Sequence, residues 1–208
     1  MLIFLLIFVL INIFIKTIDY MLKNQLFINL TFLIVAFSCN QNYQPKPKGL
    51  NQIYLPKPQY KVVNVSNNYS FERNNLASSN ENKDLGWFNL SYFNQGAELL
   101  ITYKKIKSQK HLNSLLDESY RLVSKHRKKA TNITETSIRT NKNHHATIID
   151  IKGEVPTPIQ FIVTDSSDNF IRAALYFEKP IKGDSLAPVV NYIKLDILHL
   201  LNTLSWNE

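Results

Sequence analysis

The sequence has few of the residues on which many catalytic and metal sites depend, with one cysteine, Cys39, and five glycines among 208 residues. A single cysteine cannot form a disulfide within the chain or supply a cysteine-rich zinc site. The shortage of glycine leaves no glycine-rich loop of the kind that binds phosphate groups. It also excludes a nucleophile elbow at Asp165-Ser166, because that strained turn needs flanking glycines.

The rest of the composition is that of a folding chain. Hydrophobic residues make up 45% of the sequence and charged residues 19%, which are ordinary values for a globular protein. The length suits one domain with appendages. Basic residues outnumber acidic ones, with a formal net charge of +8.

The first 38 residues differ from the remainder because they hold two apolar runs, residues 1–15 and 26–37. Neither run reaches the roughly 20 residues that a membrane-spanning helix needs. From Met21 onward the second run has the layout of a secretory signal, with a basic start, an apolar centre and a small residue before the cut. We therefore expect residues 1–20 to be an upstream extension or extra hydrophobic segment and residues 21–38 to be a signal peptide. A longer membrane-anchored form that starts at Met1 is the alternative.

Cys39 follows the second apolar run in the order Ala36-Phe37-Ser38-Cys39. This stretch resembles a bacterial lipobox, in which the cysteine receives fatty acids such as palmitate and becomes the mature N-terminus. The alternatives are an apolar residue inside a membrane segment and a reactive thiol, and the thiol is disfavoured because no nearby His or Cys would lower its pKa. Residues 39–84, rich in proline and asparagine, are predicted to form a tether.

Residues 85–208 are predicted to form a single α+β domain. Alternating apolar residues predict a hairpin of residues 87–93 and 97–105, and three- and four-residue spacing predicts a helix over residues 110–128. Further strands are expected at residues 133–140, 146–153, 158–165 and 170–177. A last helix, capped by Asp184 or Ser185 with Pro188 in its first turn, ends the chain. This order predicts a mostly antiparallel sheet sandwiched by two helices.

Candidate catalytic and metal-binding groups are scarce. Asp196 and His199 share one side of the last helix, but we expect a surface hydrogen bond there rather than catalysis. His144 and His145 are neighbours in a strand, so their side chains point to opposite faces and cannot bind one metal by spacing alone. We expect no catalytic residue, no metal and no cofactor.

A basic run near the end of the first helix has two interpretations. It could contact an anionic membrane surface, where each basic residue contributes about 1 kcal/mol. It could also offset the helix dipole, at roughly 0.3–1 kcal/mol each, and we favour this second interpretation. The run consists of Lys125, Arg127, Lys128 and Lys129.

The polar turn between the last two strands is a candidate partner contact. Its residues are Ser166, Asp168 and Asn169, with Arg172 just beyond them. Turn chemistry explains the same residues equally well. The prolines of the tether are a second candidate, because an extended segment can lie along another protein.

The last third of the chain, Pro158 to Trp206, resembles the gliding motility lipoprotein GldD family of the Bacteroidetes. The resemblance depends on the "TDS…FIRAALYF" hairpin and the "DSLAPV" helix start. Support comes from "YQPKPKG" after Cys39, from "NYSFE" at residues 68–72 and from "YRLVSKH" at residues 120–126. The chain departs from the family pattern at Asn169 and Ala173, where histidine and glycine are expected, and this weakens any site at the hairpin tip.

The resemblance implies a membrane-anchored lipoprotein of the cell envelope, facing the periplasm, in either the inner or the outer membrane. It implies a non-enzymatic role in the assembly or stability of the gliding and type IX secretion machinery, through contacts with other motility lipoproteins. It also implies a PsbP/Mog1-type α/β/α sandwich. Nucleic acid is not expected as a partner, because a secreted, acylated protein does not meet a genome. The alternative is a periplasmic module that binds a small ligand or a glycan in a cleft.

Overall fold

The computed structural model describes residues 10–25, 53–66, 68–178 and 186–207. The chain divides into two compact units, residues 1–49 and residues 50–208. In the first unit, residues 10–25 form one helix, which runs without a break across the predicted start of the signal peptide at Met21. Within the described ranges no helix is both long and apolar enough to cross a membrane. Cys39 lies outside the described residues.

The second unit is built on a seven-stranded antiparallel sheet in the order β3-β4-β5-β9-β8-β7-β6. The β4–β5 connection is a short 3₁₀ turn, Phe93–Gln95, as expected for the predicted hairpin. The strands are β3 (Ser78–Asn82), β4 (Trp87–Tyr92), β5 (Ala97–Lys105), β9 (Asn169–Phe177), β8 (Ile159–Thr164), β7 (His145–Gly153) and β6 (Ala130–Arg139).

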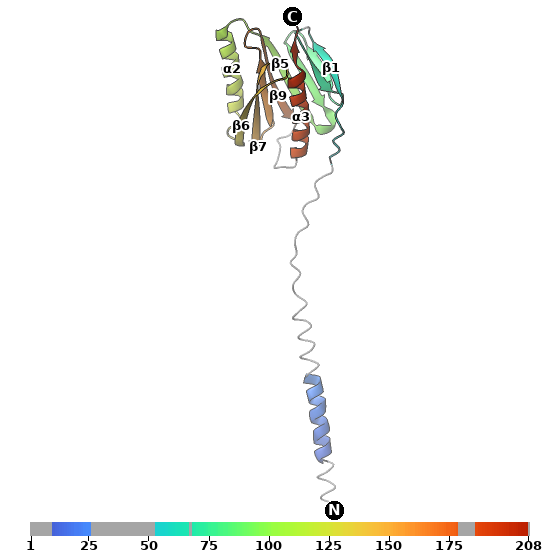
Figure 1. The fold of residues 1–208 in the computed structure, drawn as a ribbon. Helices are drawn as coiled ribbons and strands as arrows, with labels where there is room; N and C mark the ends of the chain where they lie inside the picture. The colour runs from blue at the N-terminus through green and yellow to red at the C-terminus, as the bar shows by residue number, and fades with distance from the viewer. Residues whose placement is uncertain (1–9, 26–52, 67, 179–185, 208) are drawn as a thin grey trace, which may run out of the picture. The chain divides into compact units, whose positions relative to one another are not determined.

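Both faces of this sheet are covered (Figure 1). Helix α2 (Gln109–Ser124) packs on one face, where Leu112 meets Ile162. The other face carries helix α3 (Ala187–Thr203) and a small antiparallel sheet, ordered β1-β2-β10. The small sheet contains β1 (Tyr60–Val65), β2 (Tyr69–Asn74) and β10 (Ser205–Trp206). The mixed α+β class is confirmed, with layers of helix, sheet, and helix beside small sheet.

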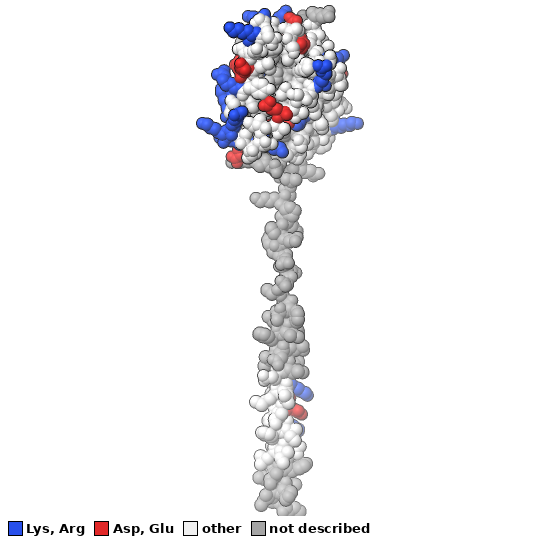
Figure 2. All heavy atoms as spheres, turned by 60° about the vertical axis from the view of Figure 1, so that its left-hand side comes forward, with Lys and Arg blue, Asp and Glu red and all other residues white. Residues whose placement is uncertain are grey.

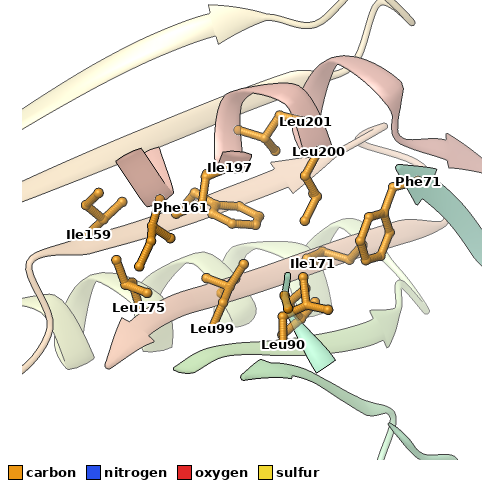
Figure 3. Packing of buried hydrophobic residues seen from close by; sticks show 14 of the residues in the cluster. Phe71, Leu90, Leu99, Ile159, Phe161, Ile171, Leu175, Ile197, Leu200 and Leu201 are labelled. Carbon is orange, nitrogen blue, oxygen red and sulfur yellow. The ribbon is translucent and has the colours of Figure 1, made fainter. Parts of the chain in front are cut away.

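The main core lies between the large sheet and the layer of α3. Figure 3 shows Ile197, Leu200 and Leu201 of α3 pointing toward Phe161 and the neighbouring strands. Successive strand residues face opposite sides of a sheet, so β8 sends Phe161 to this core and Ile162 to the α2 side. Each fully buried large apolar side chain contributes about 1.5–3 kcal/mol.

The predicted tether is wrong over much of its second half, because the strands β1, β2 and β3 lie there. Tyr69 and Phe71 of β2 are each only 1% exposed and belong to the main core. β2 pairs with β10, from the opposite end of the chain. Asn and Ser residues between the apolar positions hide the strand alternation in the sequence, and only the long-range pairing reveals it.

The helix ends also differ from the predictions. Helix α2 ends at Ser124, so the basic run follows it as a turn instead of forming its last turn. Pro188 lies in the first turn of α3, as predicted. Asp184 and Ser185 lie outside the described residues, and Leu186 occupies the N-cap position without a side-chain hydrogen bond.

Gly153 provides a test of the close approach of β7 to the start of β6. Its φ is +126°, and a Cβ there would overlap the backbone carbonyl oxygen of Lys129. We expect Gly153→Ala to lower the free energy of unfolding by about 3 kcal/mol, measured by urea titration. Gly96→Ala is the matched control, since Gly96 has a φ of +59° but no atom near the added methyl. It should cost only about 1 kcal/mol. Equal losses in both variants would contradict the clash at Gly153.

Candidate functional site

The tip of the β8–β9 hairpin is organised by Asp165. Its Oδ1 accepts hydrogen bonds from the backbone N–H groups of Ser167 and Asp168, both at 3.0 Å, and of Asn169 at 2.9 Å. Its Oδ2 accepts one from the side-chain amide of Asn169 at 2.6 Å. Burial would raise the pKa of Asp165, but these hydrogen bonds outweigh it and lower the pKa below 3.8. The tip is therefore a closed turn built around one carboxylate.

The predicted contact residues of the tip have different surroundings. Ser166 and Asp168 are exposed, and Ser166 has a φ of +67°. Asn169 is partly buried, and its Oδ1 accepts a hydrogen bond from the Tyr103 hydroxyl at 2.8 Å. Ser166 and Asp168 thus offer side chains to solvent, while Asn169 helps to hold the hairpin against β5.

Arg172 is not part of the tip. It lies within β9 on the face covered by α2, and its Nη2 donates a hydrogen bond to Gln160 Oε1 at 2.6 Å. Gln160 donates in turn to Thr157 Oγ1 at 3.3 Å, and that hydroxyl pairs with His126 Nε2 at 2.9 Å. Burial lowers the pKa of both Arg172 and His126. The structure separates Arg172 from Ser166 and Asp168 and gives it a bracing role under α2.

The four predicted membrane-facing residues are all exposed in the turn between α2 and β6. They are Lys125, Arg127, Lys128 and Lys129. On the face shown in Figure 2, Lys and Arg side chains spread along the margin of the domain instead of gathering in one patch. The turn lies at the end of the sheet where β6 starts and where β9 ends before α3 begins.

The polypeptide enters the domain at that same end. The hydroxyl of Tyr192, in the first turns of α3, donates a hydrogen bond to the carbonyl oxygen of Pro56 at 2.9 Å. Pro56 precedes β1 by only a few residues, so the segment from the N-terminal side approaches the domain beside the start of α3. The basic turn and the incoming chain therefore share one end of the domain.

Asp196 is a buried residue of α3 and not a surface group as the sequence predicted. It is 4% exposed and accepts hydrogen bonds from the Tyr60 hydroxyl at 2.8 Å and from Asn74 Nδ2 at 2.9 Å. The Tyr92 hydroxyl also bonds to it. Burial raises the pKa of Asp196 above 3.8, although these hydrogen bonds act in the opposite direction. One carboxylate therefore joins α3 to β1, β2 and β4.

His199 does not pair with Asp196. Its Nε2 contacts Glu72 Oε2 at 2.7 Å, and its ring stacks on that of Tyr60 with centroids 3.7 Å apart. Tyr60 thus stands between the two groups, stacking on one and donating to the other. The arrangement fastens α3 to the small sheet, and the two residues do not form the aligned acid and base of a hydrolytic pair.

The adjacent residues His144 and His145 contact different neighbours. His144 precedes β7 and lies against Trp206, with ring centroids 5.3 Å apart, while His145 contacts Arg139 Nη2 at 2.8 Å. In the part of the chain that the structure describes, no group of three or more His, Cys, Asp or Glu side chains could hold a metal ion.

A cleft of about 810 Å³ opens beside the first turns of α3. Three lysines line it, Lys129, Lys152 and Lys194, together with Asp150 and Glu154. Lys194 Nζ lies 2.7 Å from both carboxylate oxygens of Asp150, so one of the three cations is already paired. Lys129, Lys152 and Glu154 remain, so the unpaired side chains of the lining carry one net positive charge for an anionic group.

These observations define a class of protein, a single α+β sandwich domain whose buried polar side chains join its elements. The particular family follows from the sequence match. A family model described as gliding motility lipoprotein GldD matches residues 40–206. The chain therefore belongs to the GldD family of gliding motility lipoproteins, as the resemblance predicted, and a lipoprotein family implies a membrane-anchored protein of the cell envelope. No curated protein matches the chain.

Asp196 should make stability depend on pH. The pKa of Asp196 in the folded protein is raised above 3.8, so the native state binds the proton more tightly than the unfolded state does. The protonated Asp196 therefore stabilises the fold at low pH, and this stabilisation is lost as the pH rises through the raised pKa. The difference in unfolding free energy between Asp196→Asn and the parent should therefore shift in favour of the variant as the pH rises. Urea titrations at a series of pH values measure it. Asp168→Asn, an exposed acid, is the control, and a difference for Asp196→Asn that does not vary with pH would overturn the expectation.

Proposed function

We propose that this protein is an acylated, periplasm-facing component of the gliding and type IX secretion machinery of the Bacteroidetes. It acts through protein contacts, by assembling or stabilising that machinery together with other motility lipoproteins, and it is not an enzyme. The single observation that carries the proposal is the family match over residues 40–206. The use of the buried Asp196 and the partly buried His199 and Arg172 in joining elements supports a role in binding more than one in catalysis.

The proposed anchor is Cys39. It follows a small residue at the end of an apolar run, and the family match begins at the next residue, Asn40. Each methylene of an acyl chain buried in the bilayer contributes about 0.8 kcal/mol, and stable anchoring requires two membrane signals. Several acyl chains on one cysteine would meet that requirement.

A Cys39→Ala variant should lose fatty-acid labelling and leave the membrane fraction, because no thiol remains to be acylated. Labelling of cells with a fatty acid, followed by fractionation, measures both. Ser38→Ala is the matched control, since it keeps a small residue before the cysteine and should be labelled like the parent. A Cys39→Ala protein that is still labelled and fractionates like the parent would show that the anchor lies elsewhere.

The basic turn at Lys125 to Lys129 is proposed as a weaker membrane contact. It lies at the end where the chain enters the domain, which is the end that the anchored segment leads to. Each cation near an anionic surface contributes about 1 kcal/mol, screened by salt. Replacing the four basic residues by Gln in the Cys39→Ala protein should weaken its binding to vesicles that contain anionic lipid. Unchanged binding would assign these residues to solvation of the helix end.

The hairpin tip is proposed as the partner contact. It joins the end of β8 to the start of β9, and the nine residues of β9 separate it by roughly 30 Å from the end where the chain enters. Ser166 and Asp168 are exposed there on a turn whose backbone is already held by Asp165. Binding would therefore cost little conformational entropy in this turn. The tip can therefore meet a protein away from the end where the chain enters the domain.

Capture of the acylated protein from crosslinked cells tests the partner contact. The parent should retain motility or secretion lipoproteins, and Asp168→Lys should retain at least severalfold less with an unchanged melting temperature, because the Asp168 side chain is exposed. Asp84→Lys places the same change in another exposed turn and should capture as the parent does. Equal capture by both variants would exclude the tip as the contact.

The lysine-lined cleft favours a second candidate function, a module that binds an anionic small ligand or glycan. Lys129 and Lys152 face this space of about 810 Å³. Absence of lipoprotein partners after crosslinking, together with a rise in melting temperature on addition of an anionic saccharide, would favour this function over the first.

A further inference from the structure

Strand β6 forms one edge of the large sheet and is the edge with the least protection. It has ten residues, and most of its side chains are exposed. The opposite edge, β3, has five residues, and the edge strand β1 has six, carries Lys61 and follows Pro58 closely. Short length, lysine and proline are the usual means by which edges avoid pairing with another chain. β6 has neither lysine nor proline, and its one irregularity lies at its first residues.

The backbone groups on the open side of β6 can be assigned from the sheet register. Ile151 of β7 donates its N–H to Pro158, toward β8, so its neighbour Asp150 directs its backbone groups toward β6. Asp150 faces Thr134. Alternate residues of β6 therefore turn their N–H and C=O groups outward, with no strand beyond them among the described residues. They are Ile133, Glu135, Ser137 and Arg139.

The charges on β6 favour one particular partner, a second copy of the same strand. Glu135 and Arg139 are its only charged residues and lie on the same face of the sheet. In an antiparallel pair with Ser137 opposite Ser137, Glu135 of each copy faces Arg139 of the other. This register also sets outward backbone groups opposite each other, as hydrogen bonding requires. Related two-fold registers centred on Glu135 or on Arg139 place like charges opposite and are disfavoured.

We propose that two copies of this protein pair edge to edge through β6, in the antiparallel register centred on Ser137, to form one continuous sheet. Three facing pairs then exchange backbone hydrogen bonds, and two Glu135–Arg139 pairs fix the register. The hydrogen bonds that Glu135 and Arg139 make within one copy do not prevent these pairs. Tyr120 hydrogen-bonds to Glu135, and Arg139 donates one of its five N–H groups to His145, so each charged group keeps atoms for the partner.

The pairing is compatible with two anchors in one membrane. In this register the starts of the two β6 strands, which lie at the ends where the chains enter, are 14 residues or about 48 Å apart along the strand direction. The residues between Cys39 and Pro56 reach up to roughly 55–60 Å when extended, at about 3.3–3.6 Å each. The inference is independent of the proposed partner contact at the hairpin tip, which lies elsewhere on the domain.

Disulfide trapping of the full chain in cells tests the pairing. Ser137→Cys should give a covalent dimer after mild oxidation, because facing residues of a hydrogen-bonded pair lie about 5.5 Å apart, within the range of a disulfide. Thr131→Cys is the matched control. It is an exposed residue of the same strand, but its copy would lie roughly 40 Å away in this register, so no dimer is expected.

Charge reversal tests the register. In the Ser137→Cys background, Glu135→Arg should lower the dimer yield severalfold, since it sets Arg opposite Arg139, and adding Arg139→Glu should restore it. No dimer from Ser137→Cys, equal dimer from Thr131→Cys, or no rescue by the double reversal would each overturn the proposal. A crosslink from Ser137→Cys to a protein of another size would also overturn it and assign this edge to a different chain.

Discussion

The carboxylate of Asp196 is the interaction on which the arrangement of the domain depends. It lies on α3 and receives hydrogen bonds from Tyr60 of β1, Asn74 of β2 and Tyr92 of β4. A buried carboxylate is costly unless it is fully hydrogen-bonded, so each of these donors must be in place for the helix to pack. The bond to Tyr60 makes the segment before residue 85 part of the domain, and the bond from Tyr192 to Pro56 then sets where the chain enters.

The point where the chain enters serves to locate the other surface features of the domain. The incoming chain and the basic turn after α2 share one end, and the Asp165-centred hairpin tip lies at the other. The exposed edge β6 runs between the two ends. The domain thus has the incoming chain at one end, the hairpin tip at the other end, and a lateral edge for a second copy. The three surfaces can act without competing for the same side chains.

Elements with clear periodicity were predictable from the sequence, and those with polar strands were not. Alternation in residues 97–105 and 170–177 identified two central strands, and the spacing of Leu112 and Val123 identified α2. β2 was not predicted because Asn, Ser and Glu surround Tyr69 and Phe71, and β3 was not predicted because it has no apolar residue. At the candidate sites, Ser166 and Asp168 are exposed as a polar turn suggests, but Arg172 braces the sheet under α2.

The sequence by itself determined the family, the α+β class and the presence of a turn at residues 166–169, because these depend on local composition and on ordered motifs. Only the tertiary structure decided the roles of Asp196, His199 and Arg172. Their partners come from β1, β2, β4 and β8, many residues away, and both burial and hydrogen bonding arise when those strands meet. The same holds for β6, since a strand is an edge only once the order of the whole sheet is known.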